Sequence, residues 1–251
     1  MLYRILANLT AKLPSALKYR LVGLKPAYLA VLAWRNPVVQ VKTAAGPFRW
    51  RIDGLTSQQY LLGTCEPYMQ KAFMETVRKG AVVYDVGACA GFHTLFCSLL
   101  VGPTGKVIAF DPNPACITSI RGQIRLNSGL PATILPYAVS DGCGTLHLDT
   151  SMPAGETFLT KSGGVEVEAR SIDFLVAEGA IAPPDIIKID VEGHEEQVIR
   201  GAMETLRRHP PVILCDYNDG NTLATVIQLL TPLGYAVSAG PPITAVPCPE
   251  K

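Results

Sequence analysis

Short apolar segments recur along most of the chain and alternate with longer stretches whose apolar residues have helical spacing. Runs rich in β-branched residues predict strands over 82–86, 107–110, 134–139, 186–189, 212–214 and 235–237. The intervening stretches predict helices over about 91–100, 114–126, 193–208 and 220–233. This alternation predicts an α/β fold with an open, mainly parallel sheet and helices on both of its faces.

Two regions depart from that order, and a third has no predicted element. The segment VVQVKTAAGPFRWRI, residues 38–52, alternates apolar and polar positions on both sides of a Gly-Pro pair, which predicts a hairpin. Period-two alternation in GTLHLD and VEVEAR predicts an antiparallel insertion within 142–170, near an edge of the sheet. The proline-rich stretch after Gly240 is interpreted as a linker-like tail.

The first part of the chain differs from the rest in charge as well as in pattern. Leucines at helical spacing predict a basic amphipathic segment, bent or broken near Pro14, that contains Leu2, Leu6, Leu9, Leu13 and Leu17. Residues 1–52 hold nine basic residues and no acidic one, whereas the remainder holds 13 basic and 21 acidic residues. We therefore predict a helical and hairpin extension over 1–55 and a main domain over 56–251. The extension could lie on an anionic membrane surface, or pack on its own domain or on a second copy of the chain.

Composition narrows the class of protein. With 251 residues, 48% of them hydrophobic and 17% charged, the chain can bury the core of a globular domain. A net charge of +1 and the lack of an evident aromatic stacking platform argue against nucleic acid as a partner. The seven cysteines form no CxxC pair, which favours a reducing compartment. No uncharged apolar run approaches the roughly 20 residues that span a bilayer. We expect a cytoplasmic protein, with peripheral membrane contact left open.

The segment VVYDVGACAGFHT, residues 82–94, joins a predicted strand to a predicted helix, where open parallel sheets bind their ligands. It does not match the dinucleotide fingerprint, because counting from Gly87 the third position is Cys89 and the sixth is Phe92. A P-loop lysine is also missing. An NAD(P)-dependent oxidoreductase on a similar sheet is therefore an alternative, and not the favoured interpretation.

What remains in this segment is Asp85, Gly87 and Gly91, followed by Asp111 at the end of the next predicted strand. The two glycines would let the backbone approach a ligand closely. Asp111 is placed to accept hydrogen bonds from the two hydroxyls of a ribose. Asp85 can interact with an ammonium group or, through water, with a helix N-terminus. Together these features favour a zwitterionic amino-acid nucleoside, S-adenosylmethionine, as the cofactor.

Four segments in order, VYDVGACAGFHT, GPTGKVIAFDPNP, AVSD and IIKIDVEGHEEQVIRGA, resemble the blocks of the FkbM family of S-adenosylmethionine-dependent methyltransferases. The resemblance covers roughly 80–217. It implies a Rossmann-like methyltransferase fold with a seven-stranded sheet whose final strand is antiparallel. It also implies methyl transfer, usually to a hydroxyl oxygen of a sugar or natural-product acceptor. The family often has Asn at the position of Cys89 and Glu at those of Asp111 and Asp216.

The resemblance also implies roles for individual residues. The methionine end of the cofactor would lie against Asp85, Gly87, Ala88 and Gly91. Its ribose would lie against Asp111, and its adenine edge against Ser140 and Asp141.

Transfer to an alcohol also needs a base to take the hydroxyl proton. The segment KIDVEGHEE supplies three candidates, Asp190, Glu192 and His194, just after a strand. Asp190 and Glu192 lie two positions apart, so in an extended strand end they point the same way. Three further residues are predicted to contact the acceptor: His93, Asp216 and Tyr217. We predict no metal, because the carboxylates come without a histidine pair or a fixed ligand spacing. A catalytically inactive, membrane-associated binding protein is the remaining alternative.

Overall fold

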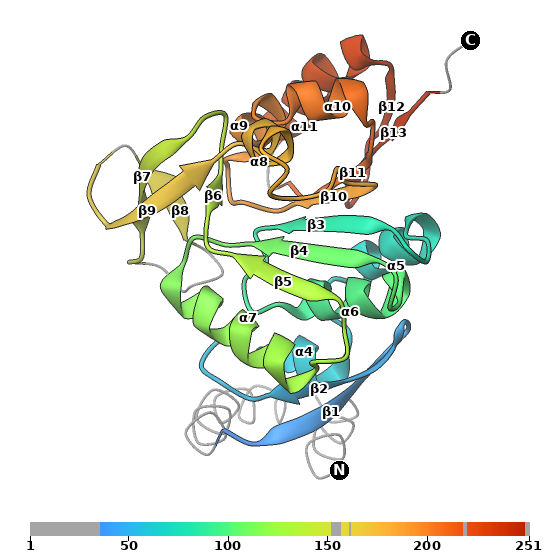
Figure 1. The fold of residues 1–251 in the computed structure, drawn as a ribbon, viewed down its shortest axis with the longest axis vertical. Coiled ribbons are helices and arrows are strands. Elements are labelled where there is room, and N and C mark those ends of the chain that lie inside the picture. The colour runs from blue at the N-terminus through green and yellow to red at the C-terminus, as the bar shows by residue number, and fades with distance from the viewer. Residues whose placement is uncertain (1–35, 152–156, 161, 218–219, 249–251) are drawn as a thin grey trace, which may run out of the picture.

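The structure, a computed structural model, describes residues 36–151, 157–160, 162–217 and 220–248 (Figure 1). The predicted leucine-rich segment falls within 1–35 and lies outside the described residues. Membrane contact or self-association through that segment therefore stays a prediction. In the part of the chain that is described, no helix combines the length and the apolar character that crossing a bilayer requires.

The centre of the molecule is a seven-stranded sheet. Its strands, in spatial order, are β12 (Tyr235–Ser238), β13 (Ile243–Pro247), β11 (Val212–Cys215), β10 (Ile186–Ile189), β3 (Val82–Val86), β4 (Lys106–Phe110) and β5 (Ala132–Leu135). The pairs from β11 to β5 are parallel, whereas β13 is antiparallel to both of its neighbours. The predicted mainly parallel sheet with an antiparallel final strand is confirmed.

The end of the chain corrects one expectation. The stretch after Gly240, predicted as a linker-like tail, contains β13. Ile243 and Ala245 in this strand are fully buried, and β13 is inserted between β11 and β12. The prolines obscured a short strand that alternates buried and more exposed positions.

Helices cover both faces of the sheet, as predicted (Figure 1). They are α4 (Gln58–Leu62), α5 (Pro67–Thr76), α6 (Phe92–Val101), α7 (Pro114–Leu126), α8 (Ile172–Ala177), α9 (Glu195–Arg200), α10 (Met203–Arg208) and α11 (Gly220–Leu230), which continues into η1 (Thr231–Leu233). Successive strand residues point to opposite faces. Tyr84 and Val86 thus pack with α8 to α11, and Val83 packs with α5 and α6.

Two predicted elements are each divided in the structure. The strand predicted over 134–139 becomes β5 and β6 (Ala138–Val139), which belong to different sheets. Pro136 lies between them and has no N–H to continue the ladder. The helix predicted over 193–208 becomes α9 and α10. Gly201 lies at this break, where a Cβ would come within 2.0 Å of the Ser140 carbonyl oxygen.

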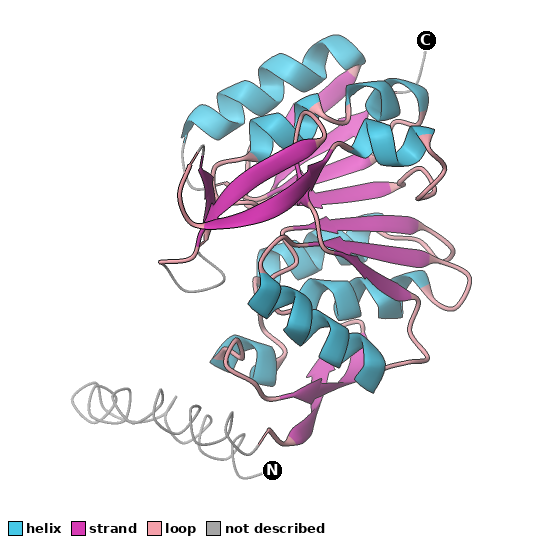
Figure 2. Cartoon of the chain, turned by 60° about the vertical axis from the view of Figure 1, so that its left-hand side comes forward, coloured by secondary structure: helices cyan, strands magenta, loops and turns pink. Residues whose placement is uncertain are grey.

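The other two predicted β regions are confirmed. A hairpin of β1 (Val38–Thr43) and β2 (Gly46–Arg51) packs Phe48 and Trp50 against Phe92 of α6. The insertion forms β7 (Gly144–Asp149), β8 (Phe158–Thr160) and β9 (Val165–Arg170), in the spatial order β6, β9, β7, β8. Figure 2, in which strands are magenta, shows this second sheet set apart from the central one. Its strands β6 and β7 form part of the wall of the site described next.

Candidate active site

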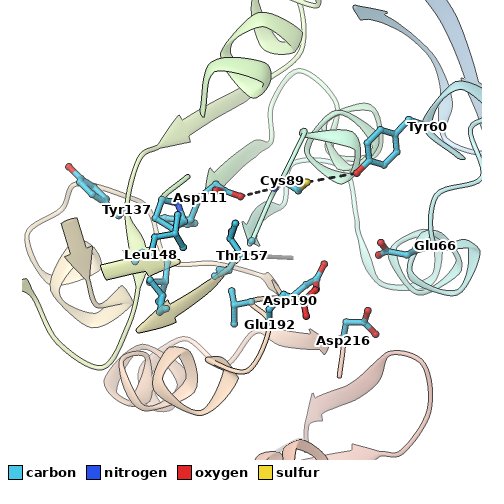
Figure 3. A pocket seen from close by; sticks show the side chains of 18 residues that line it. Tyr60, Glu66, Cys89, Asp111, Tyr137, Leu148, Thr157, Asp190, Glu192 and Asp216 are labelled. Atoms are coloured by element: carbon cyan, nitrogen blue, oxygen red, sulfur yellow. Dashed lines mark hydrogen bonds between the residues drawn. The ribbon is translucent and has the colours of Figure 1, made fainter. Parts of the chain in front are cut away.

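A cavity of about 230 Å³ lies beyond the carboxyl ends of β3, β4, β10 and β11 (Figure 3). This is where open parallel sheets bind ligands. Its described lining consists of Tyr60, Glu66, Val86, Gly87, Cys89, Phe110, Asp111, Pro112, Tyr137, Ala138, Val139, Leu148, Thr157, Leu159, Asp190, Val191, Glu192 and Asp216. The second sheet supplies an apolar wall through β6 and β7, and the segment around α4 and α5 supplies Tyr60 and Glu66.

The two glycines after β3 are explained first by contacts with the protein itself. Gly87 has a φ of +77°, and a Cβ there would come within 1.7 Å of the Asp190 carbonyl oxygen. Gly91 has a φ of +87° and faces Ile120 of α7, 3.2 Å from where its Cβ would be. Gly87 lines the cavity, whereas Gly91 and the buried Ala88 lie outside the described lining. The expectation that both glycines make room for a ligand therefore has geometric support only at Gly87.

A buried ion network lies beneath this turn. The Lys188 ammonium, 2% exposed, is 3.2 Å from Asp85 Oδ1 and 3.1 Å from Asp190 Oδ2, and it donates to the Gly87 carbonyl at 2.8 Å. The hydroxyl of Thr94 donates to Asp85 Oδ2 at 2.6 Å. Burial opposes the charge on Asp85, but Lys188 holds the pKa of this carboxyl below its usual value. Asp85 thus contacts the glycine turn through Lys188, which bonds the Gly87 carbonyl. Asp85 itself lies outside the described lining.

Asp111 directly follows β4 and faces the cavity. Its carboxylate accepts the backbone N–H of Cys89 at 2.8 Å and that of Asn113 at 2.9 Å, one on each oxygen. Burial raises the pKa of Asp111 to about 6, although both N–H groups lower it. Each carboxylate oxygen has a second lone pair, so Asp111 can still accept hydrogen bonds from a ligand.

Three carboxylates gather elsewhere in the lining, at Glu66, Asp190 and Asp216, with one oxygen from each lying within 4.8 Å of the others (Figure 3). Asp190 pairs with Lys188, and Asp216 Oδ2 accepts the Tyr68 hydroxyl at 3.0 Å. The predicted residues Asp190, Glu192 and Asp216 are thus brought to one cavity with Asp111. Their chemical roles stay predictions. Such a cluster has the oxygen ligands that a divalent cation prefers, although its charge is partly offset by the buried ammonium.

The other predicted site residues lie outside the described lining. The Ser140 hydroxyl and His194 Nε2 are 2.9 Å apart, and the same hydroxyl donates to Asp141 at 3.2 Å. His93 is 6% exposed and packs against Phe73, and Tyr217 is partly buried against the core. Roles for these residues stay predictions without direct geometric support.

Sequence reasoning missed Lys188, Tyr60 and Glu66. Lys188 had a signal, because it is a single charge within the otherwise apolar strand IIKI. Tyr60 and Glu66 come from outside the recognised segments, and neither belongs to a motif. Only the packing of α4 against the hairpin and α6, and of α5 against the sheet, brings them to the cavity.

Similarity to known proteins identifies the family to which this site belongs. The family model described as the methyltransferase FkbM domain matches residues 85–237. The chain belongs to the FkbM methyltransferase family. This match supports the methyltransferase interpretation over a nicotinamide-dependent oxidoreductase and over an inactive binding protein.

Two relatives share modest identity with this chain. The chain is 28% identical over 162 residues to the hexuronic acid methyltransferase AglP of Haloferax volcanii, covering 63% of this chain and 62% of that protein. It is 26% identical over 198 residues to the 31-O-demethyl-FK506 methyltransferase FkbM of Streptomyces tacrolimicus, covering 65% and 75%. The match thus spans less than two thirds of the length of AglP.

A solved structure, the precorrin-6y C5,15-methyltransferase of Geobacter metallireducens, matches with a TM-score of 0.50 at 16% identity. The match covers 78% of this chain and 92% of that one, and it shows that the two share a fold.

Proposed function

We propose that this FkbM-family protein transfers a methyl group from S-adenosylmethionine to a hydroxyl oxygen of a small-molecule acceptor. One observation carries the proposal: a single cavity at the strand ends holds Asp111 in one part and the cluster Glu66, Asp190 and Asp216 in another. The first suits a ribose, and the second suits an acceptor with several hydroxyls.

The residues present fit the cofactor. S-adenosylmethionine supplies an electrophilic methyl group carried on a positively charged sulfur. Asp111 lines the cavity, where its carboxylate can accept hydrogen bonds from the ribose hydroxyls. The apolar wall of Val139, Leu148 and Tyr137 suits an adenine ring. Gly87 also lines the cavity, and the neighbouring carboxylates favour a positive charge.

The acceptor is proposed to be a carbohydrate or a natural product with free hydroxyls. Two relatives are named for acceptors of these kinds, a hexuronic acid and 31-O-demethyl-FK506. The carboxylate cluster can accept hydrogen bonds from more than one hydroxyl and would repel an anion. The geometry therefore favours a neutral polyhydroxyl compound over an acidic sugar.

Calorimetry with the purified protein tests the cofactor. We expect binding of S-adenosylmethionine and none of NAD or NADP. Asp111→Asn should weaken S-adenosylmethionine binding by about 10-fold to 100-fold, since a hydrogen bond to a charged group contributes about 1.5–3 kcal/mol. Glu178→Gln, at an exposed position outside the described lining of the cavity, serves as the control and should bind like the parent. Binding of a nicotinamide cofactor in place of S-adenosylmethionine would contradict the proposal.

A screen of neutral and acidic hydroxyl compounds with methyl-labelled cofactor identifies the acceptor. Mass spectrometry reads both the product and the position of the label. Methylation of a nitrogen or carbon alone would contradict the assignment to oxygen.

A further inference from the structure

Glu66 is held in a strained backbone conformation at the edge of the cavity. It is a non-glycine residue with a φ of +39°, immediately before α5, and Pro67 occupies the first helical position. A residue at this place commonly caps the helix with its side chain. The Glu66 side chain makes no such hydrogen bond, and its carboxylate lines the cavity. Strain of this kind persists where the surrounding structure enforces it and is concentrated at functional sites.

The three clustered carboxylates differ in their ion-pair and hydrogen-bond partners within the protein. Asp190 is ion-paired with Lys188, and Asp216 accepts the hydroxyl of Tyr68. Glu66 Oε2 is buried and has no hydrogen-bond partner among the described residues. Its other oxygen, Oε1, accepts a hydrogen bond from the weakly donating thiol of Cys65 at 3.7 Å. Of the three carboxylates, Glu66 is therefore the least engaged by the described residues, and its side chain is still 30% exposed.

Groups from several elements face Glu66. His93 Nδ1 of α6 lies 3.7 Å from Oε2, but burial and then Lys188 lower the pKa of His93 to about 4, so the ring is neutral at neutral pH. Burial, together with the charges of Asp190 and Asp216, raises the pKa of Glu66 to about 7, although Lys188 and the Cys65 thiol oppose this. A carboxylate with such a pKa is a far stronger base than an exposed one and is still partly ionised at neutral pH.

We propose that Glu66 accepts the hydroxyl proton of the acceptor during methyl transfer. The inference rests on the proposed function. In this step the acceptor oxygen bonds to the methyl carbon, and the carbon–sulfur bond of the donor breaks with its electron pair left on sulfur. The O–H bond breaks as well, and its proton passes to the Glu66 carboxylate. Glu66 lies outside residues 85–237, so the family match does not assign it.

The proposal gives Asp190 and Asp216 a different role from Glu66. Because each already has a partner, they are placed to accept hydrogen bonds from the reacting hydroxyl or its neighbours and to orient them. This moves proton transfer away from the predicted candidates Asp190, Glu192 and His194. His194 is also held against Ser140, outside the described lining.

The main test compares Glu66→Gln with Glu75→Gln, an exposed position on the same helix-bearing segment. Glu66→Gln should lower kcat about 10²-fold to 10⁴-fold, the range for loss of a general base. The parent kcat/KM should rise with pH through a midpoint near 7, as Glu66 ionises. That acid limb should be absent in Glu66→Gln. Glu66→Gln should bind the demethylated cofactor as the parent does, as measured by calorimetry. Glu75→Gln should match the parent in every measurement.

A second readout does not depend on turnover. In protein labelled with ¹³C at the glutamate carboxyls, one signal should titrate near pH 7 and disappear in Glu66→Gln. Asp190→Asn removes a charge that raises the pKa of Glu66, so it should move that signal and the acid limb to lower pH. It should also reduce turnover while leaving cofactor affinity nearly intact.

Three results separate the possible failures. A parent protein that binds no S-adenosylmethionine removes the proposed function and this proposal with it. A parent that methylates its acceptor while Glu66→Gln keeps both kcat and the acid limb removes only the role of Glu66. Loss of activity on chelation, restored by Mg²⁺, would show that the carboxylates hold a cation and would equally overturn Glu66 as the proton acceptor.

Discussion

At the residue scale, Gly87 shows how the residue type at a motif position can be determined by contact with a distant part of the chain. The sequence predicts that glycine makes room for a ligand. In the structure the backbone of Asp190 occupies the space where a Cβ would lie, with 1.7 Å between the Cβ position and the carbonyl oxygen. The loops after β3 and β10 can meet only because residue 87 has no side chain.

Gly87→Ala should therefore destabilise the protein more than an alanine at an equally strained but uncrowded glycine. Gly234 provides that control, with a φ of +81° and no described atom within 4 Å of its Cβ position. We expect Gly234→Ala to cost about 1 kcal/mol of unfolding free energy, from backbone strain alone. Gly87→Ala should cost about 2 kcal/mol more, because the loops must separate. Urea denaturation measures both, and equal losses would contradict the clash.

At the element scale, side chains of α7 and of its C-cap hold the hairpin in place. They form hydrogen bonds with the backbone of β2, as a neighbouring strand would. Gln123 accepts the Arg51 N–H at 2.9 Å and donates to the Arg51 carbonyl at 2.8 Å. Asn127 makes the same pair of bonds with the backbone of Arg49, at 2.9 and 2.7 Å. The hairpin predicted as part of an extension is thus joined to the predicted main domain through these bonds.

Gln123→Ala should lower the unfolding free energy by about 2 kcal/mol, since it leaves a backbone donor and acceptor of β2 unpaired. Arg121→Ala, at an exposed position of α7, is the control and should change it by less than about 0.5 kcal/mol. Hydrogen exchange should locate the loss at Arg51. Unchanged protection of that amide in Gln123→Ala would show that the hairpin is held by its apolar contacts alone.

The elements themselves were largely predictable, and the exceptions have physical causes. The helix predicted over about 114–126 has those bounds in the structure, where Asn113 caps its first turn and Pro114 begins it. The division of α9 from α10 was not, since it coincides with a close approach of Gly201 to Ser140. Local patterns report which face of a segment is buried, and they do not report what that face meets.

At the scale of the whole molecule, Lys188 connects the centre of the sheet to the cavity. It lies on β10 and joins Asp85 of β3, the Gly87 carbonyl and Asp190 through a single buried ammonium. A buried ion pair broken on one side leaves an uncompensated charge, which commonly costs more than losing both partners.

Lys188→Met should accordingly lower the unfolding free energy by about 3 to 5 kcal/mol, because Asp85 is left charged and fully buried. Adding Asp85→Asn removes that charge and should recover part of the loss. The exposed pair of Arg207 and Glu204 is the control, and Arg207→Met should cost less than about 1 kcal/mol. Denaturation of the parent and of these three variants tests this explanation. A double variant less stable than Lys188→Met would refute it.

The sequence by itself determined most of the strands and helices, the hairpin, the insertion and the family, because each depends on local periodicity or on contiguous motifs. It also singled out Asp111, Asp190, Glu192 and Asp216, since each follows a strand at the edge where parallel strands end. Only the tertiary structure decided that Glu66 joins them and that Lys188 supports them. The physical reason is that the order of strands in the sheet and the packing of α4 and α5 bring together loops from distant parts of the chain. No local sequence pattern encodes which of these loops meet.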